Sequence, residues 1–230
     1  MATATPTGTA FGGFTRDAID FLAELAANNQ RDWFQPRKAD YERLVKGPLE
    51  ALCVALAERL DARAIPLRSD PTRSPFRIYR DTRFSKDKSP YKPYASASFP
   101  WQDGEHLGPG GYFHFQPGEM YIGGGMWHPE PARLAAWRSL VVGDPATVHR
   151  AIDDPRFGAT FGEVHGDALK RAPAGYPQDH PEAALLKLKD VTFGRRLSDD
   201  EALSPDLPEA LAAAFADAVP VFRLLARLGD

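Results

Sequence analysis

Residues 111–125 read GYFHFQPGEMYIGGG, and this stretch decides the fold. Aromatic residues fill its first half, and a second short apolar run follows the Pro-Gly pair. The four residues 116–119, QPGE, are typical of a tight turn, so the stretch predicts a β-hairpin. Two earlier aromatic-rich runs bounded by Gly and Pro are FRIYR (76–80) and PYASASFPW (93–101). We therefore expect an antiparallel sheet of about four strands.

Helical patterns lie on both sides of this sheet. Apolar residues repeat at helical spacing within 18–25, and a second stripe follows Pro36. Pro48 lies on that second stripe and should kink or divide the helix. After the sheet, helical patterns cover residues 129–142, 144–152 (with Asp144 as the cap) and 207–228 (with a kink at Pro220).

A weaker β pattern covers residues 161–171 and 185–197. Helices, then strands, then more helices and strands are the α+β pattern. We expect a central antiparallel sheet with N-terminal and C-terminal helices packed on it. Residues 1–13 read as a disordered tail and residues 14–230 as a single domain. Whether the two β patterns share one sheet stays open.

Composition limits the classes of function. The chain is 43% hydrophobic and 26% charged, an ordinary globular balance, and its net charge is -3. The whole molecule is therefore not built to attract nucleic acid or an anionic membrane. Its single cysteine, Cys53, is expected to be a packing residue and fits a reducing compartment. No secretory signal or membrane span is recognised, so a cytoplasmic location is expected.

Residues 76–92, FRIYRDTRFSKDKSPYK, form a charged segment. Read as a strand, residues 76–84 place Phe76 and Ile78 on one face and a polar row on the other. Arg80 then shares the apolar face, where an unpaired charge is costly. Arg80 therefore needs a carboxylate partner, or the strand ends near Tyr79. The polar row consists of Arg77, Tyr79, Asp81 and Arg83.

Charge is concentrated in this part of the chain. Residues 68–92 contain eight basic residues and three acidic ones, a local charge of +5 within a chain of net charge -3. Arginine offers a planar fork that suits phosphate or carboxylate, and neighbouring aromatic rings can stack on a ring or base. An internal network is the alternative, in which Asp81 and Asp87 pair with Arg80, Arg83 or Lys88.

Two other features are candidates for a site. GGGMWHP (123–129) follows a strand and precedes a helix, and its glycines allow close approach of a ligand or a tight bend of the sheet. His114 is expected to share a strand face with Tyr112 and Gln116. No His pair has metal-ligand spacing, so no metal site is expected. No cofactor is identified.

The residues assembled above resemble a known family. The stretches FLAELAANNQRDWF (21–34), FRIYRDTRFSKDKSPYK (76–92) and YIGGGMWHPEPARLAAWR (121–138) look like the domain-of-unknown-function family numbered 2461. The resemblance runs from about Phe14 to about Leu228. It implies no activity, cofactor or catalytic residue. The family pattern carries over onto Asn28, Asn29, Trp33, Phe34, Arg77, Arg80, Asp81, Arg83, Phe84, Asp87, Lys88, Pro90, Tyr91, Gly124, Gly125 and Trp127.

Three hypotheses follow from the charged segment. In the first, the protein recognises a phosphate- or carboxylate-bearing small molecule, with Asp81 or Asp87 orienting an arginine. If it is an enzyme, Asp81, Lys88 and Tyr91 are the candidates for proton transfer. The candidate ligand-binding residues are Arg77, Arg80, Arg83, Asp87, His114, Gly124, Gly125 and Trp127.

The other two hypotheses use the same residues differently. In the second, the segment binds nucleic acid, with Tyr79, Phe84 and Tyr91 stacking on bases. In the third, it is a non-catalytic salt-bridge network that fixes the packing of helices on the sheet. The third predicts that Arg80→Ala or Asp81→Ala lowers the melting temperature by several degrees.

Overall fold

The structure is a computed structural model that describes residues 10–83, 85–102 and 108–229. The N-terminal helices are α1 (Arg16–Ala27), α2 (Arg31–Phe34), α3 (Lys38–Tyr41) and α4 (Gly47–Ala62), with a 3-10 turn at Gln35–Arg37 and a π-helical turn at Glu42–Lys46. The strands are β1 (Ala95–Pro100), β2 (Gly110–Phe115), β3 (Tyr121–Met126) and β4 (Val191–Arg196). The later helices are α5 (Pro131–Gly143), α6 (Pro145–Ile152), α7 (Pro155–Phe161), α8 (Ala183–Lys187), α9 (Asp199–Leu203) and α10 (Leu207–Ala226), followed by a 3-10 turn at Arg227–Gly229.

The predicted hairpin is confirmed. Strands β2 and β3 pair antiparallel, with Tyr112 opposite Gly123 and His114 opposite Tyr121. The backbone N–H of Glu119 donates to the carbonyl of Gln116 at 3.0 Å, which closes the turn between the two strands. The sheet order is β1-β2-β3-β4, antiparallel throughout. Because β4 pairs with β3, the part of the second β pattern that forms a strand belongs to the same sheet. The strand expected at residues 161–171 is reduced to the isolated bridges His165–Thr192 and Ala168–Leu188, and residues 183–187 form helix α8.

The strand expected at residues 76–84 does not form over the described residues 76–83. Isolated bridges from Pro75 to Ala97 and from Tyr79 to Tyr91 are the pairing that the structure gives this part of the chain. Proline has no N–H to donate, so Pro75, together with Pro90 and Pro93 on the returning chain, interrupts a regular ladder. The expected apolar pair is also split: Ile78 is 6% exposed, whereas Phe76 is 46% exposed.

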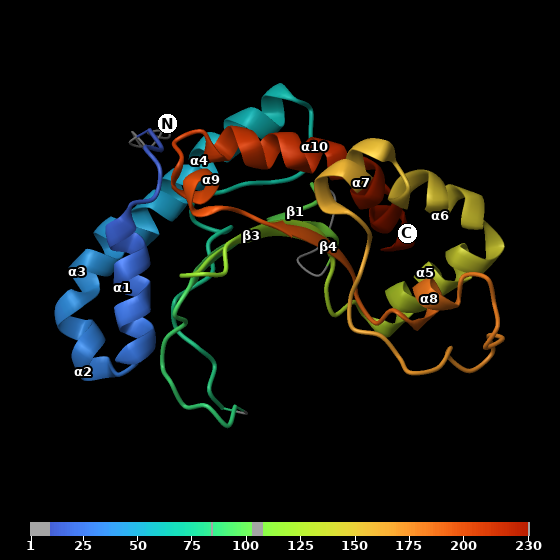
Figure 1. Ribbon diagram of the computed structural model, residues 1–230, viewed down its shortest axis with the longest axis horizontal. Helices are drawn as coiled ribbons and strands as arrows, with labels where there is room; N and C mark the ends of the chain where they lie inside the picture. Colours follow the sequence, from blue (N-terminus) through green and yellow to red (C-terminus); the bar gives the residue numbers. More distant parts are fainter. Residues whose placement is uncertain (1–9, 84, 103–107, 230) are drawn as a thin grey trace, which may run out of the picture.

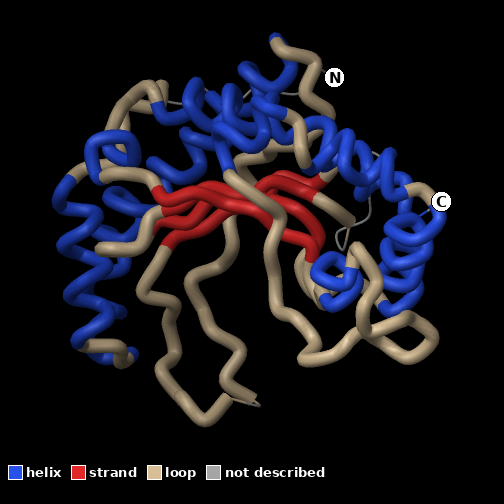
Figure 2. The backbone as a smooth tube through the Cα atoms, turned by 45° about the vertical axis from the view of Figure 1, so that its right-hand side comes forward, coloured by secondary structure: helices blue, strands red, loops and turns tan. Residues whose placement is uncertain are grey.

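Helices cover one face of the sheet. Figure 2 shows helices on one side of the strands, and α4 and α10 lie there in Figure 1. Phe215 and Phe222 of α10 are fully buried against this face. A Cβ at Gly124 would lie 2.7 Å from the Phe222 ring, so glycine at this position of β3 makes room for the helix. On the opposite side of the sheet, the charged segment projects away from the strands.

The helical predictions hold closely. The predicted stripe of α1 is buried, and α4 begins with Pro48 in its first turn, so the long N-terminal pattern is divided there. Asp144 caps α6 by accepting from the backbone N–H of Thr147 at 3.1 Å. Helix α10 continues through Pro220. Cys53 is fully buried in α4, and burial raises the pKa of its thiol to about 12.

A single hydrophobic core joins the N-terminal helices, the sheet and α10, which defines an α+β fold. Of the predicted tail, residues 1–9 lie outside the described residues, and Phe11 packs against the core. Within the described part of the chain, no helix combines the length and apolar character needed to cross a membrane.

Candidate functional site

The charged segment is anchored at its C-terminal end to the N-terminal helices. Tyr91 is 1% exposed, and its ring stacks on Phe34 with centroids 4.2 Å apart. The side-chain amide of Asn29 donates to the carbonyl of Tyr91 at 2.9 Å and accepts from its N–H at 3.0 Å. Two stretches that the family resemblance singled out are thus in direct contact. Their contact fixes where the charged segment leaves the body of the protein.

Four of the eight charged residues of the segment form ion pairs within it. Arg80 forms an ion pair with Asp87, which meets the requirement that Arg80 have a carboxylate partner. The other oxygen of Asp87 accepts from the backbone N–H and hydroxyl of Ser89, at 2.9 Å and 2.6 Å. These hydrogen bonds from Ser89, and then the Arg80 guanidinium, hold the pKa of Asp87 well below its usual range.

A second pair lies beside the first. Arg83 donates to both carboxylate oxygens of Asp81, with Nη2 at 2.7 Å from Oδ2. This contact lowers the pKa of Asp81 to about 2. Lys88 donates from Nζ to the backbone carbonyl of Thr82 at 2.9 Å. Arg80, Arg83 and Lys88 thus each bond to another residue of the same segment, as expected for an internal network.

Three cations of the described segment, Arg77, Lys86 and Lys92, take no part in this network, and Arg77 and Lys92 lie near each other. Among the described residues, no carboxylate forms an ion pair with Arg77 or Lys92. Lys92 places Nζ 5.2 Å from the ring centroid of Phe76 and 6.0 Å from that of Tyr94. Burial, and then the nearby positive charge of Arg77, lower the pKa of Lys92. The two cations are therefore close enough to repel each other beside exposed aromatic surface.

These rings continue onto the open face of the sheet. Tyr94 lies 4.6 Å from the ring of His114, and His114 stacks on Tyr121 at 4.8 Å with 16° between the planes. Phe76 lies 6.3 Å from Tyr112. A continuous aromatic surface thus runs from the base of the charged segment across strands β2 and β3.

His114 is at the centre of this surface, and its expected face is confirmed. Its Nε2 is 3.3 Å from Oε1 of Gln116, and its Nδ1 is 3.1 Å from the hydroxyl of Tyr112. An amide oxygen only accepts, so Nε2 carries the proton and Nδ1 accepts from Tyr112. Burial lowers the pKa of His114, which favours the neutral ring. Both ring nitrogens already have partners.

The candidates for proton transfer have different surroundings. Asp81 is exposed and paired with Arg83, and Lys88 is held by a backbone carbonyl. Tyr91 is buried, with its hydroxyl 3.4 Å from the side-chain nitrogen of Gln35. The three groups are therefore spread along the segment, and within the described part of the chain no contact joins any two of them.

The glycine-rich stretch lies at the far end of β3. Strand β3 runs from Tyr121 to Met126, and Tyr121 stacks on His114. At about 3.3 Å per residue, the six steps from Tyr121 to Trp127 place Trp127 up to about 20 Å from His114. A Cβ at Gly125 would collide with the Val191 carbonyl of β4, and φ of Gly125 is +115°. Gly124 and Gly125 thus have packing reasons to be glycine. Trp127 makes no ring contact with the charged segment among the described residues.

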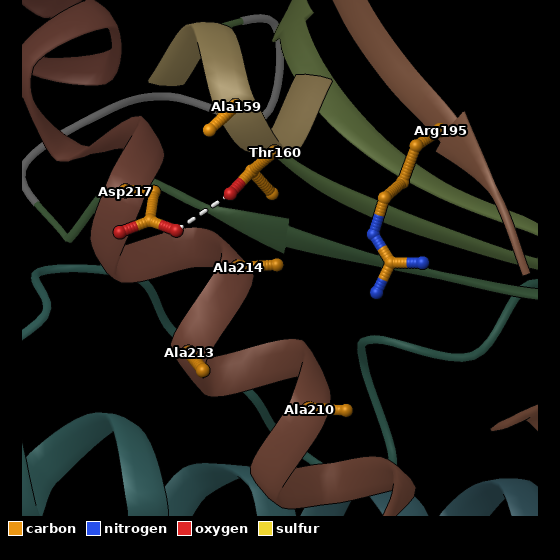
Figure 3. A pocket seen from close by; sticks show the side chains of 7 residues that line it. All are labelled: Ala159, Thr160, Arg195, Ala210, Ala213, Ala214 and Asp217. Atoms are coloured by element: carbon orange, nitrogen blue, oxygen red, sulfur yellow. Dashed lines mark hydrogen bonds between the residues drawn. The ribbon is translucent and has the colours of Figure 1, made fainter. Parts of the chain in front are cut away.

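Two hollows of the surface lie away from the charged segment. One lies between α7, β4 and α10, where Thr160 donates to Asp217 at 2.7 Å and alanines of α10 form a wall (Figure 3). Its arginine, Arg195, pairs with Glu201 at 2.9 Å. Another lies between α1 and α3 and is largely acidic. In the described part of the chain, no group of three or more His, Cys, Asp or Glu could hold a metal ion.

Sequence reasoning missed Tyr94 and Tyr121 as members of the candidate site. The signal was present in PYASASFPW, where Tyr94, Ser96 and Ser98 alternate with apolar residues, as a half-buried strand requires. Phe84, assigned to base stacking, lies outside the described residues.

The fold and the surface define an α+β protein with an aromatic, basic face. A family described as a conserved hypothetical protein, DUF2461, matches residues 17–223. This match covers most of the 230 residues, so the chain belongs to the DUF2461 family. No curated protein and no solved structure matches the chain. Membership confirms the resemblance seen in the sequence and carries no activity over to this chain.

Proposed function

We propose that the protein binds a small molecule in which a phosphate or carboxylate is joined to a planar ring. Arg77 and Lys92 contact the anion, and the ring lies on the aromatic surface formed with Phe76 and Tyr94. The observation that carries this proposal is the pair of cations without a carboxylate partner among the described residues.

Electrostatics supports an anion at this point. Moving a lysine partly out of water disfavours its charged form, and a second cation nearby adds to that cost. Burial and Arg77 both lower the pKa of Lys92. A bound anion would remove the repulsion and restore the charged form. The fork of Arg77 suits two oxygens of a phosphate or carboxylate.

The remaining charges of the segment have a supporting role in this proposal. Arg80 and Arg83 are held by Asp87 and Asp81, so their charges are largely balanced. Asp81 also lies near Arg77, whose charge contributes to lowering the pKa of Asp81. The proposal is therefore one of binding. It assigns no reaction, because both nitrogens of His114 are engaged and the proton-transfer candidates are dispersed.

The nucleic-acid hypothesis is less well supported. Tyr91 is 1% exposed and stacked on Phe34, so its ring is not available to a base. Tyr79, at 47% exposed, is available.

A cytoplasmic location belongs to the proposal as well, since the single thiol is fully buried in α4 and cannot form a disulfide within the chain.

Thermal shift against nucleotides, sugar phosphates, carboxylic acids and phenyl phosphate tests the proposal. A ligand at 100 times its dissociation constant stabilises the folded state by about 2.7 kcal/mol. We expect phenyl phosphate to raise the melting temperature more than inorganic phosphate or phenol, because only phenyl phosphate combines ring and anion. Absence of stabilisation across the panel at millimolar concentration would overturn the proposal.

Lys92→Gln is the variant that tests the site, because it removes the charge and keeps much of the chain length. Lys86→Gln is the matched control, since Lys86 is an exposed lysine of the same segment. The stabilisation should be lost in Lys92→Gln and kept in Lys86→Gln. Equal loss in both variants would indicate general attraction to a basic region.

A further inference from the structure

A histidine at the far end of β3 is held by a buried carboxylate. Oδ1 of Asp190 accepts from the backbone N–H of His128 at 2.6 Å and lies 2.9 Å from its ring Nδ1. Asp190 is 4% exposed. Burial alone would raise its pKa, but the hydrogen bonds from His128 hold that pKa below its ordinary value. A single carboxylate oxygen therefore fixes both the backbone and the ring of His128.

The backbone of His128 is itself unusual. Its φ is +48°, in the left-handed region that residues other than glycine rarely adopt. Such conformations cost free energy and are found preferentially at functional sites. Here the two hydrogen bonds to Asp190 hold His128 in that conformation. They also hold its ring in one orientation.

The hydrogen bond to Asp190 determines which ring nitrogen of His128 is available. A carboxylate accepts, so Nδ1 of His128 carries the proton that Asp190 receives, and Nε2 holds the lone pair. The side chain of His128 is 64% exposed. No residue in the described part of the chain bonds to Nε2. The lone pair of Nε2 is therefore presented to solvent.

A large aromatic ring lies against this imidazole. The rings of Trp127 and His128 stack with centroids 4.0 Å apart and 14° between their planes. Trp127 is 72% exposed, a high value for so large an apolar side chain. Its indole shields one face of the imidazole from water while the ring edge that carries Nε2 stays accessible.

We propose that His128 is a nucleophilic site that accepts an acyl or phosphoryl group at Nε2, with Asp190 as its positioning residue. The Nε2 lone pair forms a bond to the carbonyl carbon or phosphorus of the donor. The bond from that atom to the leaving group breaks, and the leaving group departs with the electron pair. The Nδ1 proton stays in the hydrogen bond to Asp190, whose negative charge balances the imidazolium.

This site is distinct from the proposed anion site, because His128 lies beyond the Met126 end of β3, whereas Phe76 and Tyr94 of the anion site contact Tyr112 and His114 of β2. It uses neither Arg77 nor Lys92. Failure of one proposal therefore leaves the other standing.

Two reagents distinguish the acyl from the phosphoryl donor. Diethylpyrocarbonate transfers an ethoxycarbonyl group and releases ethyl carbonate, and phosphoramidate transfers a phosphoryl group and releases ammonia. Peptide mass spectrometry then gives the rate at each histidine. We expect His128 to react faster with at least one reagent than His165, an exposed histidine whose Nδ1 lies 3.5 Å from the Thr192 hydroxyl. A rate at His128 no higher than at His165 with both reagents would overturn the proposal.

Asp190→Asn separates activation from mere exposure. Asparagine keeps an oxygen that accepts the backbone N–H of His128 but no longer carries the charge. Loss of a positioning partner commonly costs about tenfold or more in activity, so the rate at His128 should fall by about that factor while the rate at His165 stays the same. An unchanged rate at His128 would contradict the role of Asp190.

A measurement on the unmodified chain covers the case in which Asp190→Asn does not fold. Nitrogen-15 NMR of the histidine rings should show that the neutral ring of His128 carries its proton on Nδ1 and not on Nε2. A proton on Nε2 in the neutral ring would overturn the proposal without any substitution.

Discussion

The side-chain amide of Asn29 pairs with both backbone polar groups of Tyr91, accepting at 3.0 Å and donating at 2.9 Å. A residue in the loop after α1 thus replaces the strand partner that Tyr91 lacks on this side. Asn29 is the right residue for this contact, because its amide offers a donor and an acceptor in one plane.

Removing this amide should destabilise the protein. Asn29→Ala leaves the N–H and carbonyl of Tyr91 without their partners, at about 1–3 kcal/mol for each group that stays buried. Urea unfolding measures the loss. Asn28→Ala is the control, since Asn28 is exposed and bonds only to the carbonyl of Glu24 in its own helix. Equal losses in the two variants would contradict a special stabilising role for the Asn29–Tyr91 hydrogen bonds.

Tyr91 should act through its ring rather than its hydroxyl. In Tyr91→Phe the stack on Phe34 is kept, and only a 3.4 Å contact with Gln35 is lost. We expect a change in unfolding free energy within about 0.5 kcal/mol, against about 3–5 kcal/mol for Tyr91→Ala. Ligand-induced stabilisation should be the same in Tyr91→Phe and the original chain. A Tyr91→Phe variant that folds normally but no longer responds to ligand would show that the hydroxyl is functional.

The two ion pairs of the charged segment should differ in their effect on stability. The side chain of Arg80 is 27% exposed, whereas that of Arg83 is 77% exposed. Water screens the exposed pair strongly, and such pairs contribute little to stability. Calorimetry should therefore show a clear drop in melting temperature for Arg80→Ala and little change for Arg83→Ala or Asp81→Ala. The hypothesis of a purely structural network instead requires a drop of several degrees for Asp81→Ala as well.

His114 should make stability depend on pH. Burial lowers its pKa when the chain is folded, so protonation favours the unfolded state. Its contribution is complete above about pH 6.5, the ordinary histidine value, and is lost as the pH falls below that value. Melting temperatures at about pH 7.5 and pH 5.5 should fall more in the original chain than in His114→Gln, which does not titrate. Equal falls in the two proteins would rule out this role.

The comparison isolates His114 because other titrating groups are common to both proteins. His149 lies between Asp153 and Glu182, and its pKa is raised, first by Glu182. Its contribution has the opposite sign and is lost as the pH rises. Subtracting the His114→Gln result cancels it.

Local patterns predicted the parts of the fold that local forces determine. The β2–β3 hairpin follows from its turn, and the buried stripe of α1 follows from its periodicity. The failure at residues 76–84 has a physical cause, since alternation of side chains suggested a strand while Pro75 and Pro90 prevent a regular ladder. The pairing of β4 with β3 joins residues about 70 positions apart, which no local pattern encodes.

The candidate site was predicted in part. Charge segregation singled out the segment, but formal charge does not tell which cations find a carboxylate. The structure pairs Arg80 with Asp87 and Arg83 with Asp81, and it places Lys92 beside the rings of Phe76 and Tyr94 in the chain before β1. His128 appeared in the sequence only as one residue of GGGMWHP (123–129), because its partner Asp190 lies 62 residues further on.

The most direct test of the central claim is calorimetric titration of phenyl phosphate into the original chain, Arg77→Ala, Lys92→Gln and Lys86→Gln. A hydrogen bond to a charged group contributes about 1.5–3 kcal/mol, so loss of either partner should weaken binding about tenfold or more. The account predicts this weakening for Arg77→Ala and Lys92→Gln and an unchanged affinity for Lys86→Gln. Equal affinity in all four proteins, or binding that inorganic phosphate matches, would contradict it.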